Sequence, residues 1–144
     1  MIAVVCSWHD CHEEALREIQ ERLSRKQRMV VAAHTLIEAY SVLTRLPAPH
    51  RISPKDALNL LEGNFMRPLK IIVLTAAGHK VLLRGAPDAN ISGGRLYDAL
   101  IAACARKAKV QSLITFNELH FAAFEGSDLE IVVPRRKISK PEEG

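Results

Sequence analysis

The stretch that decides the fold is RLYDALIAACARKAKVQSLITFN, residues 95–117. Residues 95–108 are predicted to be helical, and the nearly unbroken apolar run over 99–105 indicates that this helix is deeply buried. Residues 112–115, with Leu113 and Ile114 at their centre, then predict a strand. A buried helix that leads into a buried strand is typical of an α/β domain.

The same alternation continues on both sides of this stretch. Further strands are predicted at 29–33, 71–74 and 129–133. Further helices are predicted near 10–26, from 35 to before Pro47, from Ser53 onward and near 79–84. The fold class is therefore α/β, with a mainly parallel sheet of four to five strands and helices on both faces. We expect one domain over 1–134 and a polar tail over 135–144.

Three helix starts have capping signals. Asp10 with Glu13, and Thr35 with Glu38, have the spacing of capping boxes. Ser53 precedes a proline, which is typical of an N-cap followed by the first helical residue. The core face predicted for this third helix consists of Ala57, Leu58, Leu61 and Phe65.

Composition excludes several classes of protein. With 48% hydrophobic and 25% charged residues among 144, the chain is neither collagen-like nor disordered. No apolar run is long enough for a membrane span, the first residues do not resemble a signal peptide, and the three cysteines are an odd number. We therefore expect a cytoplasmic protein without membrane contact. The net charge of +4 allows a nucleic-acid partner.

Three polar residues are predicted to share one edge of the sheet. Glu38 follows the strand 29–33, Asn117 follows the strand 112–115, and Asp98 lies near the start of the helix between two strands. Helices that follow parallel strands begin at the carboxyl ends of those strands, where ligands bind in such folds. We therefore expect Glu38, Asp98 and Asn117 at one rim.

A rim with two carboxylates and an amide is an oxygen-rich site that suits Mg²⁺ or Mn²⁺. Two carboxylates about 4 Å apart repel by about 4 kcal/mol at an effective dielectric constant of 20, so a proton or a cation is needed between them. A divalent cation there could activate water for phosphodiester hydrolysis. Each residue also has a structural interpretation: Glu38 as the capping partner of Thr35, Asp98 as a complement to the helix dipole, and Asn117 as a turn residue.

Two other groups of residues are weaker candidates. The cluster Cys6, His9, Cys11 and His12 contains zinc-ligand types, but its spacing does not match a usual zinc site. Basic residues that could contact phosphates occur in three groups. They are Arg22, Arg25, Lys26 and Arg28; Arg45, His50 and Arg51; and Arg135, Arg136, Lys137 and Lys140.

The segments TLIEAYSVLTRLP (35–47), GGRLYDALIAACARKAKV (93–110) and LITFNELHF (113–121) resemble PIN-domain ribonucleases of the VapC toxin-like family. The resemblance implies a three-layer α/β/α fold whose five parallel strands have the order three-two-one-four-five. It also implies metal-dependent RNA cleavage with Mg²⁺ or Mn²⁺ held around Glu38, Asp98 and Asn117. A protein antitoxin that covers the site and a homodimer are further implications.

One feature of the family has no counterpart in this sequence. The family's first acid lies at the end of the first strand, in an Asp-Thr or Asp-Ser step, and no such step occurs here. Either that strand would precede Met1, or residues 1–5 form the first strand and Cys6 stands near the place of the acid. Asp10 is better explained as a helix cap.

The leading hypothesis is a metal-dependent endoribonuclease of toxin-antitoxin type. The alternative is a catalytically impaired PIN-like module that binds RNA or protein, because the first acid is absent. A nucleotide-binding α/β domain is a third possibility, and the missing phosphate loop counts against it.

Overall fold

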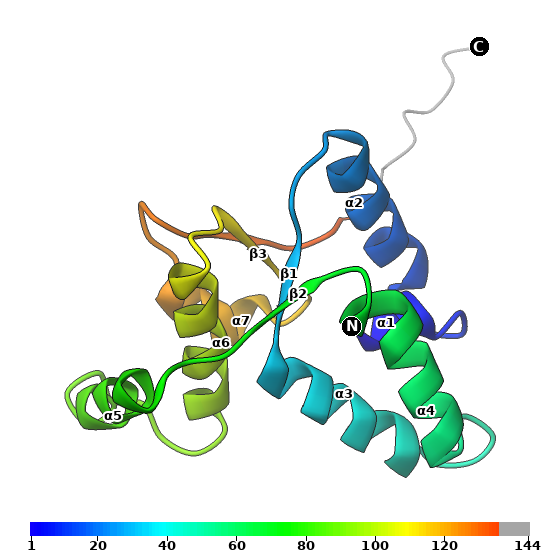
Figure 1. Cartoon of the computed structure of the whole chain (residues 1–144), viewed down its shortest axis with the longest axis horizontal. Helices are drawn as coiled ribbons and strands as arrows, with labels where there is room; N and C mark the ends of the chain where they lie inside the picture. Colours follow the sequence, from blue (N-terminus) through cyan, green and yellow to red (C-terminus); the bar gives the residue numbers. More distant parts are fainter. Residues whose placement is uncertain (136–144) are drawn as a thin grey trace.

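The computed structural model describes residues 1–135, and strands and helices alternate along them (Figure 1). The polar tail predicted for 135–144 lies, apart from Arg135, outside the described residues, and so does most of the third basic group. In chain order the elements are α1 (Ile2–Val5), α2 (His12–Ser24), β1 (Val30–Ala32), α3 (Ala33–Arg45), α4 (Pro54–Leu61), the π-helix η1 (Glu62–Met66), β2 (Lys70–Ile72), α5 (Ala76–Gly85), α6 (Arg95–Lys107), β3 (Ser112–Ile114), α7 (Glu118–Phe121), the 3-10 helix η2 (Ala122–Phe124) and β4 (Glu130–Val132).

The strands pair in parallel, as predicted, but in two separate pairs. In β1 and β2, Val31 lies opposite Ile71, and in β3 and β4, Leu113 lies opposite Ile131. The α/β class is therefore confirmed. The single sheet of four to five strands is divided, because within residues 1–135 no strand joins β1 to β3.

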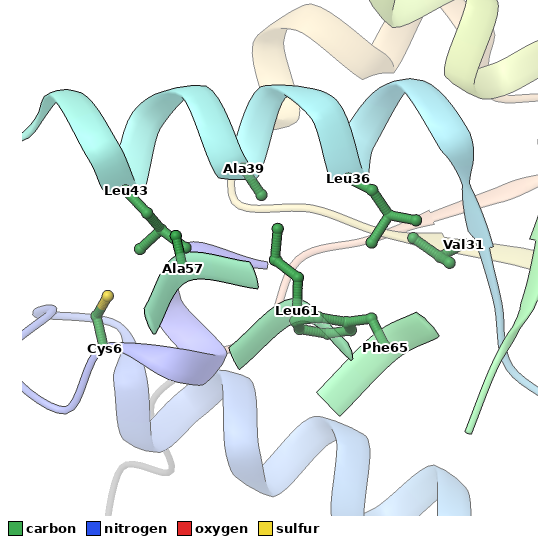
Figure 2. Packing of buried hydrophobic residues seen from close by; sticks show 8 residues of the cluster. All are labelled: Cys6, Val31, Leu36, Ala39, Leu43, Ala57, Leu61 and Phe65. Atoms are coloured by element: carbon green, nitrogen blue, oxygen red, sulfur yellow. The ribbon is translucent and has the colours of Figure 1, made fainter. Parts of the chain in front are cut away.

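Helices cover both faces of the β1–β2 pair. Figure 2 shows Val31 in a cluster with Leu36 of α3 and Phe65 of η1. The next residue of β1, Ala32, packs in a different cluster with Cys104 of α6. Because successive strand residues point to opposite faces, α3, α4 and η1 lie on one side of the strands and α6 lies on the other.

The β3–β4 pair packs against other residues of α6 than the β1–β2 pair does. Leu113 of β3 and Leu129, which precedes β4, form a cluster with Phe121 of α7 and with Ala102 and Ala105 of α6. The burial predicted for the helix over 95–108 is confirmed, since four of its alanine and cysteine residues are buried. The helix α6 therefore contacts both strand pairs and joins them.

The N-terminal predictions need two corrections. Residues Ile2–Val5 form α1 rather than a strand, because Ala3 and Cys6, three residues apart, are both buried on one helical face. Asp10 does not cap α2, which begins at His12 with Cys11 in the N-cap position. A turn in which the ring Nδ1 of His9 accepts from the Cys11 N–H moves the start of the helix beyond Asp10.

The start of α3 is also different from the prediction. The helix begins at Ala33, directly after β1, so Thr35 is its third residue and cannot be its cap. By contrast, Ser53 does cap α4, since its Oγ accepts from the Asp56 N–H at 3.1 Å. The predicted core face of this helix is correct except for Leu58, which is exposed.

Candidate functional site

The three predicted site residues lie at the starts of three helices. Glu38 lies in the second turn of α3, which follows β1 without a loop. Asp98 lies in the first turn of α6, and Asn117 occupies the N-cap position of α7, just after β3. Glu38 and Asn117 therefore follow the carboxyl ends of β1 and β3, whereas the helix of Asp98 follows α5 rather than a strand.

A series of side-chain contacts leads from Glu38 to Tyr97, which precedes Asp98 in the sequence. The Oε1 atom of Glu38 lies 3.5 Å from Nε2 of His34, one helical turn earlier. The His34 ring stacks on Tyr97 of α6, with ring centroids 4.7 Å apart. Asp98, the next residue, accepts at Oδ2 from Nδ1 of His120 in α7 at 3.2 Å. The three helices thus meet on one side of the molecule.

The two carboxylates of this series differ in their exposure. The side chain of Asp98 is 15% exposed, whereas that of Glu38 is 49% exposed. A sheltered carboxylate at the start of an apolar helix would be costly without a partner, and His120 is that partner. Asp98 is therefore held in one orientation, whereas Glu38 is open to solvent.

His34 carries a buried nitrogen with no hydrogen bond. Its Nε2 atom faces Glu38, but the geometry at 3.5 Å does not make a hydrogen bond within the described residues. Buried polar atoms almost always have a partner, so an atom without one calls for an explanation such as an ion or a water molecule at that position. The buried nitrogen and the Glu38 carboxylate therefore lie side by side.

Of the structural interpretations of the three residues, the one for Glu38 is wrong, whereas those for Asp98 and Asn117 agree with the structure. Glu38 is not the capping partner of Thr35, because Thr35 lies inside the helix. Asp98 does lie in the first turn of α6, where it also complements the helix dipole. Asn117 does form a turn: its N–H donates to Oγ1 of Thr115 at 3.0 Å, and its carbonyl accepts from His120. No hydrogen bond of the Asn117 side chain is found in residues 1–135.

Three members of this site are not among the residues predicted from the sequence. His34, Tyr97 and His120 make the contacts that bring the helices together. His34 could have been found from its position four residues before Glu38, on the same helical face. His120 could have been found from its place three residues after Asn117. Tyr97 has no such signal, because its role depends on how α3 and α6 cross.

The other candidate clusters are occupied by structural contacts. His12 donates from Nδ1 to the Ala3 carbonyl at 2.8 Å, and the ring of His9 is engaged with the Cys11 N–H. All three cysteines are free. In the first basic group, Arg22 pairs with Glu18 at 2.6 Å and donates to Ser112. The first contact of Arg22 lies within α2, and the second joins α2 to β3.

A metal ion at the rim would need ligands beyond the side chains of the described residues. Within residues 1–135 no three His, Cys, Asp or Glu side chains are grouped closely enough to hold a metal ion by themselves. Mg²⁺ does not need such a cage, because it is usually held by one or two carboxylates and completes its coordination with water and substrate phosphates. Glu38 and Asp98 supply carboxylate oxygens of the kind that Mg²⁺ prefers, whereas the His34 nitrogen beside Glu38 is a ligand more typical of zinc or iron.

The fold defines a class of protein: an α/β domain of parallel strands whose helices carry Glu38 and Asp98 in their first two turns. Comparison of the sequence with known families identifies the member of that class. The chain matches the PIN domain over residues 2–125 and belongs to that family.

Curated relatives are similar over much of the chain. Ribonuclease VapC40 from Mycobacterium tuberculosis (strain ATCC 25618 / H37Rv) is 34% identical over 113 residues, which is 78% of this chain and 78% of that protein. Ribonuclease VapC27 from the same strain is 40% identical over 81 residues, 56% of this chain and 57% of that protein. No solved structure matches significantly. In the described part of the chain, no helix has the length and apolar character needed to cross a membrane.

Proposed function

We propose that this chain is an endoribonuclease of toxin-antitoxin type that hydrolyses RNA phosphodiesters with Mg²⁺ or Mn²⁺, and that Glu38, Asp98 and Asn117 are its site. The observation that carries the proposal is the contact series from Glu38 through His34 and Tyr97 to Asp98 and His120. Relatives that cover most of the chain are named ribonucleases, which supports RNA as the substrate.

In this proposal the two carboxylates hold the cation and Asn117 orients a water molecule beside it. The bound cation supplies Lewis-acid chemistry, lowering the pKa of water and stabilising charge on a phosphoryl oxygen. Glu38, the more exposed carboxylate, faces the entering substrate. Asp98, the more sheltered one, supplies a negative charge whose orientation is fixed.

His120 is a positioning residue in this scheme. Its Nδ1–H group donates to Asp98, so one carboxylate oxygen is engaged and the other can face the cation. Second partners of this kind hold the ligand in one orientation, and removing them typically costs about 10- to 100-fold in metal affinity or activity. His34, stacked on Tyr97, holds α3 against α6 and so fixes Glu38 relative to Asp98.

The proposed partners follow from the same rim. RNA is the substrate, and the net charge of +4 favours binding of a polyanion. An antitoxin protein would inhibit the enzyme by covering the rim, and the active form would be a homodimer in the cytoplasm.

The test is cleavage of single-stranded RNA by the whole chain with Mg²⁺ or Mn²⁺. Asp98→Asn and Glu38→Gln are expected to lose more activity than the roughly 10- to 100-fold expected for His120→Gln. Asp88→Asn is the matched control, because Asp88 is exposed in the connection between α5 and α6. This control should keep full activity.

Two results would contradict the proposal. One is equal cleavage by the native chain, Asp98→Asn and Glu38→Gln, and the other is cleavage that persists in a chelator. Calorimetric titration with Mn²⁺ gives an independent measurement, since binding that Asp98→Asn abolishes supports the site. No binding at millimolar Mn²⁺ would instead favour a module that binds RNA or protein without catalysis.

A further inference from the structure

An exposed aromatic ring is linked to both carboxylates of the candidate site. Tyr97 directly precedes Asp98 in the first turn of α6. Its ring stacks on His34 of α3 with ring centroids 4.7 Å apart and ring planes only 16° from parallel. The Nε2 atom of His34 in turn lies 3.5 Å from Oε1 of Glu38. The ring of Tyr97 therefore lies where the helices of the two carboxylates meet.

The two rings of this stack differ in their exposure to solvent. The side chain of His34 is 22% exposed, whereas Tyr97 is 51% exposed. Because His34 covers one face of the Tyr97 ring, solvent reaches the opposite face and the ring edge. The stack thus leads from a sheltered ring to an open one, and a third flat ring could continue it in the offset arrangement that aromatic pairs prefer.

The open ring is held in place before any ligand arrives. The stack on His34 fixes the position of the Tyr97 ring. The hydroxyl of Tyr97 makes no hydrogen bond within residues 1–135. A binding surface that is already ordered loses less conformational freedom when its ligand binds. The ring face is therefore the part of Tyr97 that is prepared to bind.

A second stack of the same kind lies elsewhere in the described part of the chain. The ring of Trp8 lies on His50 with centroids 4.1 Å apart, and Trp8 is 44% exposed. However, Trp8 lies between α1 and α2, and His50 lies between α3 and α4. Neither residue belongs to a helix that carries Glu38 or Asp98, so the Tyr97 stack is the one located at the candidate site.

From these observations we infer that Tyr97 is a substrate-binding residue whose open face stacks on one base of single-stranded RNA. Every base has an aromatic face, so this contact is tolerant of sequence, and bases of single strands are free to leave their own stack. Each base is joined to its phosphate through one ribose, so a base on Tyr97 brings the adjoining phosphodiester toward Glu38 and Asp98. The inference takes its substrate from the proposed ribonuclease function and therefore rests on it.

The first experiment measures the stacking without depending on cleavage. Single-stranded RNA of alternating uridine and 2-aminopurine is mixed with the whole chain, once with Mg²⁺ and once with a chelator. The readout is the initial loss of 2-aminopurine fluorescence, which falls when this base stacks on another ring. The variants are Tyr97→Leu and Tyr97→Phe. The matched control is Tyr40→Leu, because Tyr40 is the other of the two tyrosines and no ring contact of it is found in residues 1–135.

We expect Tyr97→Leu to bind this RNA about fivefold or more weakly than the native chain and to quench it little. Tyr97→Phe and Tyr40→Leu should quench it as the native chain does. Equal quenching by the native chain and Tyr97→Leu would overturn the inference, and so would quenching by the native chain in neither condition. A loss in Tyr97→Phe as large as in Tyr97→Leu would also overturn it, because the hydroxyl would then be responsible.

The second experiment separates stacking from a structural role of Tyr97. Cleavage is measured on intact RNA and on RNAs that lack one base at successive positions around the cleaved bond. We expect Tyr97→Leu to raise KM for intact RNA and to have no further effect when the stacked base is the missing one. A variant that lowers kcat by one common factor on every RNA would overturn the inference, because Tyr97 would then act only by holding His34.

The two proposals can fail separately in these experiments. If the native chain cleaves no RNA with Mg²⁺ or Mn²⁺, the proposed function fails, and the fluorescence of 2-aminopurine still decides whether a base stacks on Tyr97. If cleavage is found and depends on Asp98, but Tyr97→Leu binds and cleaves every RNA as the native chain does, only the inference about Tyr97 fails.

Discussion

The two strand pairs are stabilised by different kinds of packing. Around β1 and β2, consecutive helices supply large aliphatic side chains, and Leu43 of α3 and Ala57 of α4 are completely buried. Around β3 and β4, the core is smaller and combines alanines of α6 with Phe121 and Leu129 from short elements. The first region thus combines segments over residues 1–69, whereas the second is formed within residues 101–131 around one helix.

The helix α6 is what joins the two regions. Cys104 packs with Ala32 and Ile72 of the first strand pair, whereas Ala102 and Ala105 pack with the second. Because the sheet itself is divided, the cooperativity of the fold depends on this helix. Buried helix surface can thus connect two parts of a domain where strand pairing does not.

The largest effect is expected in the first region. Leu43→Ala should lower the free energy of unfolding by about 3–5 kcal/mol, because it leaves a cavity among helices that cannot move together. Urea unfolding followed by circular dichroism measures this loss. The control is Leu58→Ala in α4, whose side chain is 45% exposed and whose replacement should cost less than about 1 kcal/mol. Similar losses in both variants would contradict the packing described here.

A smaller effect is expected in the second region. Leu129→Ala should cost about 2–3 kcal/mol, because the short elements around it can relax toward the gap. Its control is Leu119→Ala, since Leu119 of α7 is 89% exposed. The single tryptophan, Trp8, stacks on His50 near the first region and reports on it alone. If α6 joins the regions, Trp8 fluorescence and circular dichroism will give one midpoint in Leu129→Ala, whereas two midpoints would show that the regions unfold separately.

The smallest effect concerns a surface contact of the second region. Arg106 donates to Asp128 at 2.8 Å and to the Phe124 carbonyl, and the hydrogen bond from Arg106 lowers the pKa of Asp128. A carboxylate whose pKa is lower in the folded state adds stability above its unfolded pKa of about 3.9, and this stability is lost as the pH falls through the folded pKa.

We therefore expect Asp128→Asn to lower the urea midpoint slightly at pH 7 and not at pH 2. Asp88→Asn serves as the control at both values. A difference between native and Asp128→Asn chains that is the same at both pH values would mean that the charge of Asp128 plays no part.

The helices and strands were largely predictable because their signals are local. The apolar run over 99–105 and the serine-proline step at Ser53 fixed the positions of α6 and α4. Where a local signal failed, a competing contact was the cause: Thr35 has the spacing of a cap, but β1 runs directly into α3. The apolar first residues could have formed either a strand or a helix, and the burial of Ala3 and Cys6 decided for the helix.

The candidate site was predictable in part. Strand-to-helix order predicts that Glu38 and Asn117 follow β1 and β3, and they do, whereas Asp98 lies in the first turn of a helix that follows α5. That order says nothing about which side chains connect them. Tyr97 could not be predicted from its sequence position, because stacking on His34 requires two helices to cross at that point.

The amino-acid sequence by itself determined the class of the fold, the order of its elements and the residue types at the rim, because periodicity and strand-to-helix order act over short distances. Only the tertiary structure decided which of these residues meet, how sheltered each carboxylate is, and that the strands form two separate pairs. Those properties depend on packing between segments far apart in the chain, for which the sequence carries no local signal.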